Sequence, residues 1–135
     1  MAGQALHDYS LNGVPDTTLI ISSCLEADAV NHAVFIAPFD LVIEKATVRY
    51  PVAVGSTSTA TLRAHASGVA DDASDATSVQ VGSGVDMNAA TDTNHDFTVD
   101  AAANVIPAGS AVMLRMTAAG SATFVTTTVT CSVPR

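Results

Sequence analysis

The sequence has few basic residues. Only five of its 135 residues are Lys or Arg, against thirteen Asp or Glu, so its formal net charge is −8 at pH 7. Proteins that bind the phosphate backbone of nucleic acids use clustered Lys and Arg to displace counterions, and no such cluster occurs here. The same acidity opposes binding to anionic membrane surfaces. We therefore expect neither nucleic acid nor a membrane as a partner.

Long hydrophobic runs are also missing. No stretch approaches the roughly 18 apolar residues of a transmembrane helix. The first ten residues lack the basic and apolar regions of a secretion signal, so we predict none. Two cysteines, Cys24 and Cys131, are too few for a disulfide framework. They could meet if the first and last strands are neighbours, but we predict reduced, packed thiols, as in most cytosolic proteins.

Aromatic residues make up 4% of the chain, and tryptophan is absent. Aromatic platforms for sugar binding are therefore scarce, since Tyr9 and Tyr50 are the only tyrosines. Hydrophobic residues still reach 48%, much of it Ala and Val among many Thr and Ser. This composition favours thin β-strands. The length fits a single domain with one sizeable core.

Motifs of catalysis are missing as well. Nucleophilic catalysis needs a base beside Ser, Cys or Thr, yet the four histidines occur in unrelated contexts and no Gly-x-Ser-x-Gly elbow exists. Zinc-ligand spacings and a phosphate-binding glycine loop are also absent. We therefore expect no enzyme activity and no cofactor. The histidines are His7, His32, His65 and His95.

One segment offers oxygen ligands for a metal ion. Asp92–Asp96 places them at alternate positions, as a calcium-binding loop begins. However, Phe97 stands where the sharp-turn glycine belongs, and Ala103 replaces the twelfth-position Glu, so the segment is no EF-hand. We expect no metal site, with another cation site as the alternative to a plain acidic loop. Its candidate ligands are Asp86, Asp92, Asp96 and Asp100.

The longest apolar, β-branched stretch runs from Ala33 to Tyr50. It predicts two strands, Ala33–Ala37 and Leu41–Tyr50, which meet at a corner that Pro38 imposes. In the second strand the apolar residues change phase, because Leu41 and Ile43 are followed by Ala46, Val48 and Tyr50. A one-residue slip would expose half of them, so we predict a β-bulge at Glu44-Lys45.

Further strands are predicted by alternation and by Gly, Pro and Asn between them. In all, seven or eight short strands and no helix of ten residues indicate an all-β sandwich or barrel. A type I turn is predicted at Ile106–Gly109. The other strands are Thr17–Cys24, Thr59–His65, Ser78–Val81, Phe97–Val99, Ala111–Thr117 and Ala122–Val133.

Charge is unevenly placed along the chain. Seven of the thirteen acids fall between Asp71 and Asp100, a span without Lys or Arg. Four of the five bases fall at predicted outward strand positions, which indicates a basic sheet face and acidic loops. An ordinary solvated surface is the alternative. These bases are Lys45, Arg49, Arg63 and Arg115.

Residues 1–16 are polar and show no sustained periodicity. We predict an extended N-terminal arm, Met1–Asp16, ahead of a single β-sandwich domain at residues 17–135. One interpretation is a disordered terminus. The other is an arm that contacts a neighbouring subunit or the surface it binds, with Leu6, Tyr9 and Leu11 as its anchors.

Three segments resemble a known family. They are V-F-I-A-P-F-D-x-x-I at Val34–Ile43, the segment Gly55–Gly68, and I-P-A-G-x-x-V-x-L at Ile106–Leu114. They resemble small bacteriophage capsid decoration (cement) proteins, whose related modules serve in head fibres. The resemblance covers roughly Thr17 to Val133, and its motifs name no functional residue.

The resemblance implies an antiparallel, jelly-roll-like β-sandwich of about eight strands that assembles as a homotrimer. It implies a place on the outer capsid surface, between major capsid proteins, after synthesis in the host cytoplasm. We therefore expect a structural virion protein that stabilises the phage head. The alternative is a receptor- or glycan-binding module of a phage head or tail fibre. It would bind through the loops between Ala66 and Asn94, which are rich in Gly, Ser, Ala and Asp.

Overall fold

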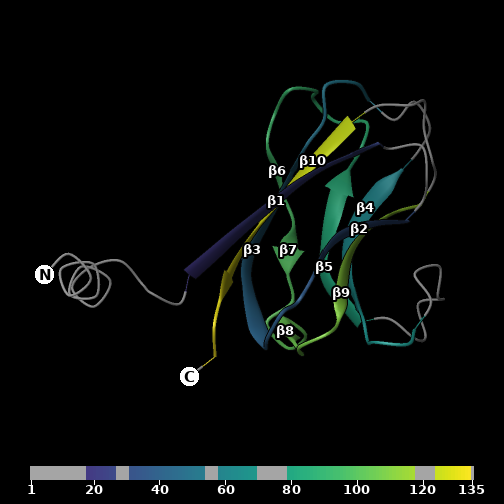
Figure 1. Cartoon of the computed structure of the whole chain (residues 1–135). Helices are drawn as coiled ribbons and strands as arrows, with labels where there is room; N and C mark the ends of the chain where they lie inside the picture. The colour runs from purple at the N-terminus through teal and green to yellow at the C-terminus, as the bar shows by residue number, and fades with distance from the viewer. Residues whose placement is uncertain (1–17, 27–30, 54–57, 70–78, 118–123, 135) are drawn as a thin grey trace, which may run out of the picture.

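Figure 1 shows a computed structural model of the chain, which describes residues 18–26, 31–53, 58–69, 79–117 and 124–134. Within these residues the chain forms ten strands and no helix, and hence no helix that could span a membrane. The strands are β1 (Thr18–Glu26), β2 (Asn31–Ile36), β3 (Leu41–Arg49), β4 (Thr59–His65), β5 (Val79–Asp86), β6 (His95–Asp96), β7 (Thr98–Val99), β8 (Val105–Ile106), β9 (Ala111–Met116) and β10 (Phe124–Ser132).

The strands form two antiparallel sheets that pack as a sandwich. Sheet A has the order β1-β10-β3-β6, with β8 also paired to β3, and sheet B has the order β2-β9-β4-β5-β7. Pairing is nested, because β1 pairs with β10, β2 with β9, β3 with β6 and β8, and β4 with β5. This is the arrangement of a jelly roll. The predicted all-β antiparallel sandwich is confirmed, with three of its ten strands only two residues long.

Strand β3 lies inside sheet A and contains the predicted bulge. Lys45 lies opposite Thr130 and Ile43 opposite Cys131, so Glu44 is the extra residue. As a result the apolar residues on both sides of Glu44 point into the core. Leu41, Ile43, Ala46, Val48 and Tyr50 are all fully buried.

Two features of the strands differ from the predictions. A second bulge lies in β2, where the register shifts between Ala33 and Phe35, so that both Val34 and Phe35 pack toward the core. Strand β5 is longer than the predicted Ser78–Val81, because it continues through Gly82 and Gly84. A Cβ atom at Gly82 would lie 3.2 Å from the Cβ of Phe97, so glycine there permits close packing and does not end the strand.

The turn before β9 also differs from its prediction. The backbone hydrogen bond runs from Ser110 N to Pro107 O (3.1 Å), one residue later than the predicted Ile106–Gly109 turn. Gly109 is thus the third residue, and its φ of +83° is that of a type II turn. The predicted type I turn is therefore wrong, because the backbone NH of Gly109 instead donates to Ala37 O (2.8 Å).

The predicted outward position of four bases is only partly correct. Lys45 and Arg49 are exposed and Arg115 is half-buried, but Arg63 is only 5% exposed. Arg63 lies opposite Met113, which is buried outside the core cluster, and its Nη1 donates to Gln80 Oε1 (3.3 Å). Alternation gives the face of a strand on which a residue lies, but not whether other atoms cover that face.

The core has one polar position that predicts a stabilising substitution. Thr127 lies between Val125 and Val129 on β10, is fully buried, and its Oγ1 has no hydrogen-bond partner. A buried hydroxyl without a partner costs about 1–3 kcal/mol, and valine has nearly the same shape. We expect Thr127→Val to raise the free energy of unfolding by about 1–2 kcal/mol and Tm by roughly 3–8 °C.

Chemical denaturation and calorimetry measure this gain. Thr128→Val is the matched control, because the Thr128 hydroxyl lies on the outer face and hydrogen-bonds to Ser22 Oγ (3.1 Å). We expect the control to change stability by no more than about 0.5 kcal/mol. Equal gains in both variants would show that β-propensity, and not the buried hydroxyl, is responsible.

Candidate functional site

The outer face of sheet A carries a continuous set of polar side chains. Strand β10 produces it by alternation, because Val125, Thr127 and Val129 point inward while Thr126, Thr128 and Thr130 point outward. Outward residues of β3 lie directly opposite them, since Thr126 pairs with Arg49, Thr128 with Thr47 and Thr130 with Lys45. We call this surface the polar face, made of Ser22, Lys45, Thr47, Arg49, Asn94, Asp96, Thr126, Thr128 and Thr130.

Asp96 is the acidic residue of the polar face, and its carboxylate has two partners there. Its Oδ1 accepts a hydrogen bond from Thr47 Oγ1 (2.7 Å), and its Oδ2 lies 3.2 Å from Lys45 Nζ. The Thr47 hydrogen bond, together with Lys45, lowers the pKa of the Asp96 carboxyl below its usual value. The carboxylate therefore stays charged in mild acid and neutralises one of the two bases of this face.

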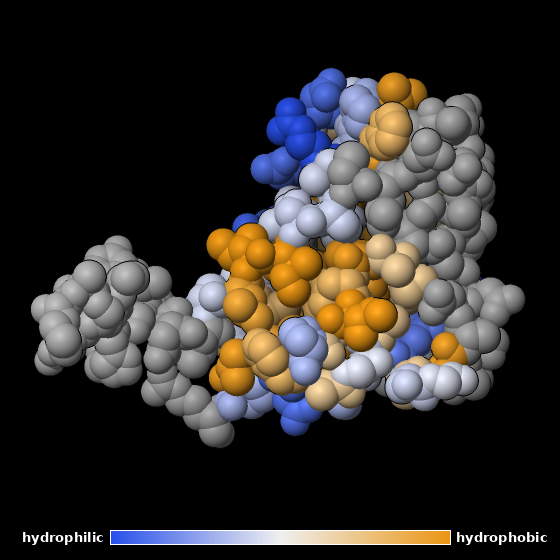
Figure 2. Space-filling model, in the orientation of Figure 1, coloured by the Kyte–Doolittle hydropathy of each residue, from blue (hydrophilic) through white to orange (hydrophobic). Residues whose placement is uncertain are grey.

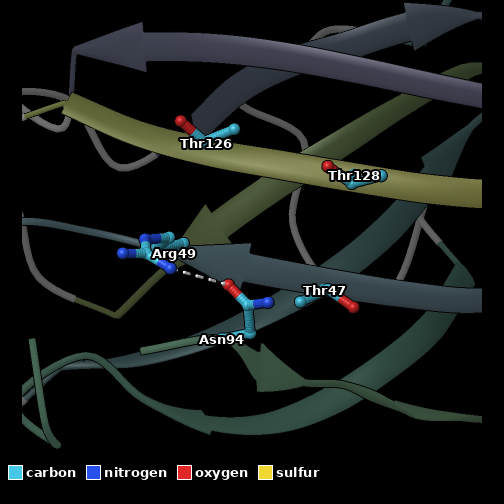
Figure 3. A pocket seen from close by; sticks show the side chains of 5 residues that line it. All are labelled: Thr47, Arg49, Asn94, Thr126 and Thr128. Carbon is cyan, nitrogen blue, oxygen red and sulfur yellow. Dashed lines mark hydrogen bonds between the residues drawn. The ribbon is translucent and has the colours of Figure 1, made fainter. Parts of the chain in front are cut away.

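The other base, Arg49, borders a shallow hollow of about 310 Å³ (Figure 3). Thr47, Asn94, Thr126 and Thr128 line it as well. Arg49 Nη1 donates to Asn94 Oδ1 over 3.5 Å, which is a long hydrogen bond. The guanidinium, hydroxyl and amide groups can hold an acceptor such as a carboxylate or a sugar hydroxyl. These five residues therefore offer hydrogen-bonding groups for a polar ligand.

The four aspartates of the alternative cation site do not gather. Asp86 Oδ1 accepts from the backbone NH of Asn88 and Asp100 Oδ1 from that of Ala102, both over 2.9 Å. Asp96 is held by Lys45 and Thr47 as described. Among the residues that the structure describes, no three His, Cys, Asp or Glu side chains lie close enough to share a metal ion. The cation alternative is therefore not supported, because nearby backbone NH groups hold the carboxylates of Asp86 and Asp100, and side chains of β3 hold that of Asp96.

His95 has a structural environment. Its ring stacks on Tyr50 with centroids 5.3 Å apart, and its Nε2 lies 2.7 Å from the carbonyl oxygen of Ala90. Tyr50 itself donates its hydroxyl to Asp86 O (2.8 Å). Burial, with a smaller contribution from Asp86, raises the pKa of Tyr50. These contacts fasten the end of β3 to β5 and β6.

The first and last strands are neighbours, yet the two cysteines do not meet. Cys24 lies opposite Thr126 and Cys131 opposite Leu19, five residues apart along β10. That spacing is about 16 Å, well beyond the roughly 7 Å that a disulfide can span. Cys131 is a buried free thiol, and burial, with a smaller contribution from Glu44, raises its pKa to about 11. It is therefore a packing residue and not a reactive one.

The predicted contact residues Leu6, Tyr9 and Leu11 lie outside the described residues, as does the whole arm at residues 1–16. Their role stays a prediction. Of the polar face, sequence patterns indicated Asp96 as a candidate cation ligand and Lys45 and Arg49 as part of a basic sheet face, but not the outward threonines of β10, because Thr126, Thr127 and Thr128 are consecutive.

No protein-family model matches the chain, and no curated protein matches its sequence. Solved structures do match the whole fold. A chain in the acidic stable capsid structure of Helicobacter pylori bacteriophage KHP30 is 10% identical, with a TM-score of 0.51, over 89% of this chain and 90% of that one. A chain in the capsid asymmetric unit of cyanophage Pam1 is 17% identical, with a TM-score of 0.50, over 87% and 85%.

This chain shares its fold with chains of two phage capsids. Because nearly all of each matched chain is covered, the likeness is to chains of similar size and not to one domain of a larger protein. At this low identity the likeness concerns the jelly-roll fold, while residues and partners have to be argued from this chain itself.

Proposed function

We propose that this protein is a structural component of a bacteriophage virion that decorates the outer surface of the capsid. The observation that carries the proposal is the whole-chain likeness to chains of two phage capsid structures. The motif resemblance at Val34–Ile43 and Ile106–Leu114 supports the same role. In this role the protein binds the major capsid protein and further copies of itself as a homotrimer.

The surface of the domain suits such a role. A decoration protein works through many repeated contacts, and several copies held together raise the effective concentration of each contact. The polar face offers a row of hydroxyls with Arg49 and Lys45, and the exposed apolar side chains offer further contact area. Residues 1–16 would extend this contact onto the capsid or a neighbouring copy, so that adjacent capsid subunits are tied together.

Phage particles assembled with and without this gene test the proposal. We expect the protein in purified wild-type particles by mass spectrometry, and its density on the outside of the head by electron cryomicroscopy. Particles without it should release their DNA at a lower temperature, and adding the purified protein should restore both the density and the heat resistance. A chain that lacks residues 1–16 should fold normally but fail to restore them.

Two results would contradict the proposal. The first is a particle that never contains the protein. The second is density confined to a fibre tip, together with binding to host cells or a glycan array, which would favour the receptor-binding alternative. Full decoration by the truncated chain would contradict the role of the arm alone.

A further inference from the structure

The edge strands of the two sheets lie together on one side of the sandwich. Strand β1 is the last strand of sheet A and β2 the last strand of sheet B, and the two strands contact each other. In the described part of the chain, β1 pairs only with β10 and β2 only with β9. Within the described residues, the outer backbone edges of both strands are therefore unpaired. Soluble proteins usually shorten, charge or cover such edges.

Apolar side chains surround these two edges. We call this surface the open side, made of Leu19, Ile20, Ile21, Phe35 and Ile36. Ile20 and Ile36 are 70% and 68% exposed and are the two most exposed large apolar side chains described. Leu19, Ile21 and Phe35 point inward, since they lie opposite Cys131, Val129 and Val112, yet all three stay only half-buried. Figure 2 shows hydrophobic side chains gathered over β1 and β2.

The register explains this exposure. Leu19, Ile20 and Ile21 are consecutive, and successive residues of a strand point to opposite faces, so one of them has to point outward. Ile20 does so beside Thr130, while its neighbours reach a core that no further described strand closes on that side. A contiguous apolar surface of this kind marks a contact site in a soluble protein.

Charge indicates what covers the open side. None of its five residues is charged, whereas the whole chain carries −8. Two copies of so acidic a chain repel each other over most of their surface and approach best where charge is absent. A basic partner would be drawn to the acidic loops instead. Identical copies also bring edge strands of equal length, which can pair through their backbones.

We propose that the open side is the contact between copies of this chain, in which a second copy covers Ile20 and Ile36 and pairs with the β1 or β2 edge. The proposal deepens the self-association named above and rests on it. It assigns that contact to the β1 and β2 edges, which adjoin the polar face at Ile20 because Ile20 lies opposite Thr130.

The full-length chain tests this in solution. Light scattering on a size-exclusion column and sedimentation, from about 1 to 100 µM, should give the wild type a mass of two or more times 13.7 kDa. Ile20→Lys/Ile36→Lys should give 13.7 kDa, because buried lysines in the contact would lack partners. The matched control is Val52→Lys/Val105→Lys, which changes two other apolar residues, 54% and 59% exposed, and should keep the wild-type mass.

Two further measurements guard against misfolding. Circular dichroism and thermal unfolding should show the same folded domain in every variant, and Ile20→Thr/Ile36→Thr, which keeps β-branched side chains, should weaken association at least tenfold. Hydrogen exchange of the wild type should show concentration-dependent protection in residues 18–26 and 31–36 and none in residues 95–106.

Three outcomes would overturn the proposal: a wild-type monomer throughout the concentration range, lysine variants that keep the oligomer, or a control that dissociates equally. The capsid experiment stays separate from these. A monomeric chain that still decorates heads would refute the open side and leave the capsid role standing. An oligomer that dissociates as expected but never binds heads would refute the capsid role and leave the open-side contact standing.

Discussion

Deleting Thr47 is expected to abolish the folded state, whereas deleting Glu44, three residues earlier, is expected to leave it intact. Glu44 is the extra residue of the bulge in β3. Without it, the apolar residues on both sides fall into one unbroken alternation and still point inward. The main loss is the hydrogen bond from Ser132 Oγ to Glu44 Oε1 (2.6 Å) on the exposed surface.

Deleting Thr47 breaks the same alternation. Val48 and Tyr50 would turn outward and Arg49 would enter the core, or the strand would slide and bury Lys45 instead. Losing the burial of one large apolar side chain costs about 1.5–3 kcal/mol, and an unpaired buried charge costs more. Together these losses match the roughly 5–15 kcal/mol that stabilises a whole domain.

Urea unfolding and proton–nitrogen NMR spectra distinguish the two deletions. The chain without Glu44 should keep dispersed amide signals and a cooperative transition within about 1–2 kcal/mol of wild type. The chain without Thr47 should show neither. Cooperative folding of the Thr47 deletion at wild-type stability would mean that the register of β3 is not set by its apolar phase.

The second large effect is expected at Tyr50. This side chain is fully buried, donates to Asp86 O on β5 and stacks on His95 of β6, and so it joins sheet B to sheet A. Tyr50→Ala removes these contacts and leaves a cavity, with an expected loss of about 3–5 kcal/mol. Tyr50→Phe keeps the ring and loses only the hydrogen bond, at about 1 kcal/mol.

Chemical denaturation of both Tyr50 variants measures this difference. For the Phe variant, we expect a fall in Tm of roughly 3–5 °C, and for the Ala variant a fall several times larger. Equal losses in the two variants would assign the stability to the hydroxyl. A small loss in both would mean that the ends of the two sheets are held by other contacts.

The polar face and the open side differ in chemistry, and this difference bears on assembly. The polar face holds Arg49 and Lys45 with one of them neutralised by Asp96, whereas the open side is apolar and ends in unpaired strand edges. A particle component that contacts both its own copies and another protein needs two such surfaces. The two surfaces adjoin at Ile20, which lies opposite Thr130 of the polar face, and are centred on the outer face of sheet A and on the β1 and β2 edges.

Local sequence patterns were enough to predict the fold class and the register of the central strand. Alternation in Thr59–His65 and the phase change around Glu44 are local patterns, because side-chain direction along a strand depends only on position. The resemblance at Val34–Ile43 then indicated a jelly roll, and the topology confirms the antiparallel sandwich.

Which residues face another layer, an edge or solvent depends on how the strands assemble into sheets. Arg63 is buried although an exposed outward position was expected for it, and Ile20 is exposed although it lies in an apolar run. Gly82 continues a strand because Phe97 approaches it closely. In each case the outcome depends on segments far away in the chain, and strand alternation carries no information about those segments. Burial is a property of the assembled sheets, whereas direction is a property of each strand.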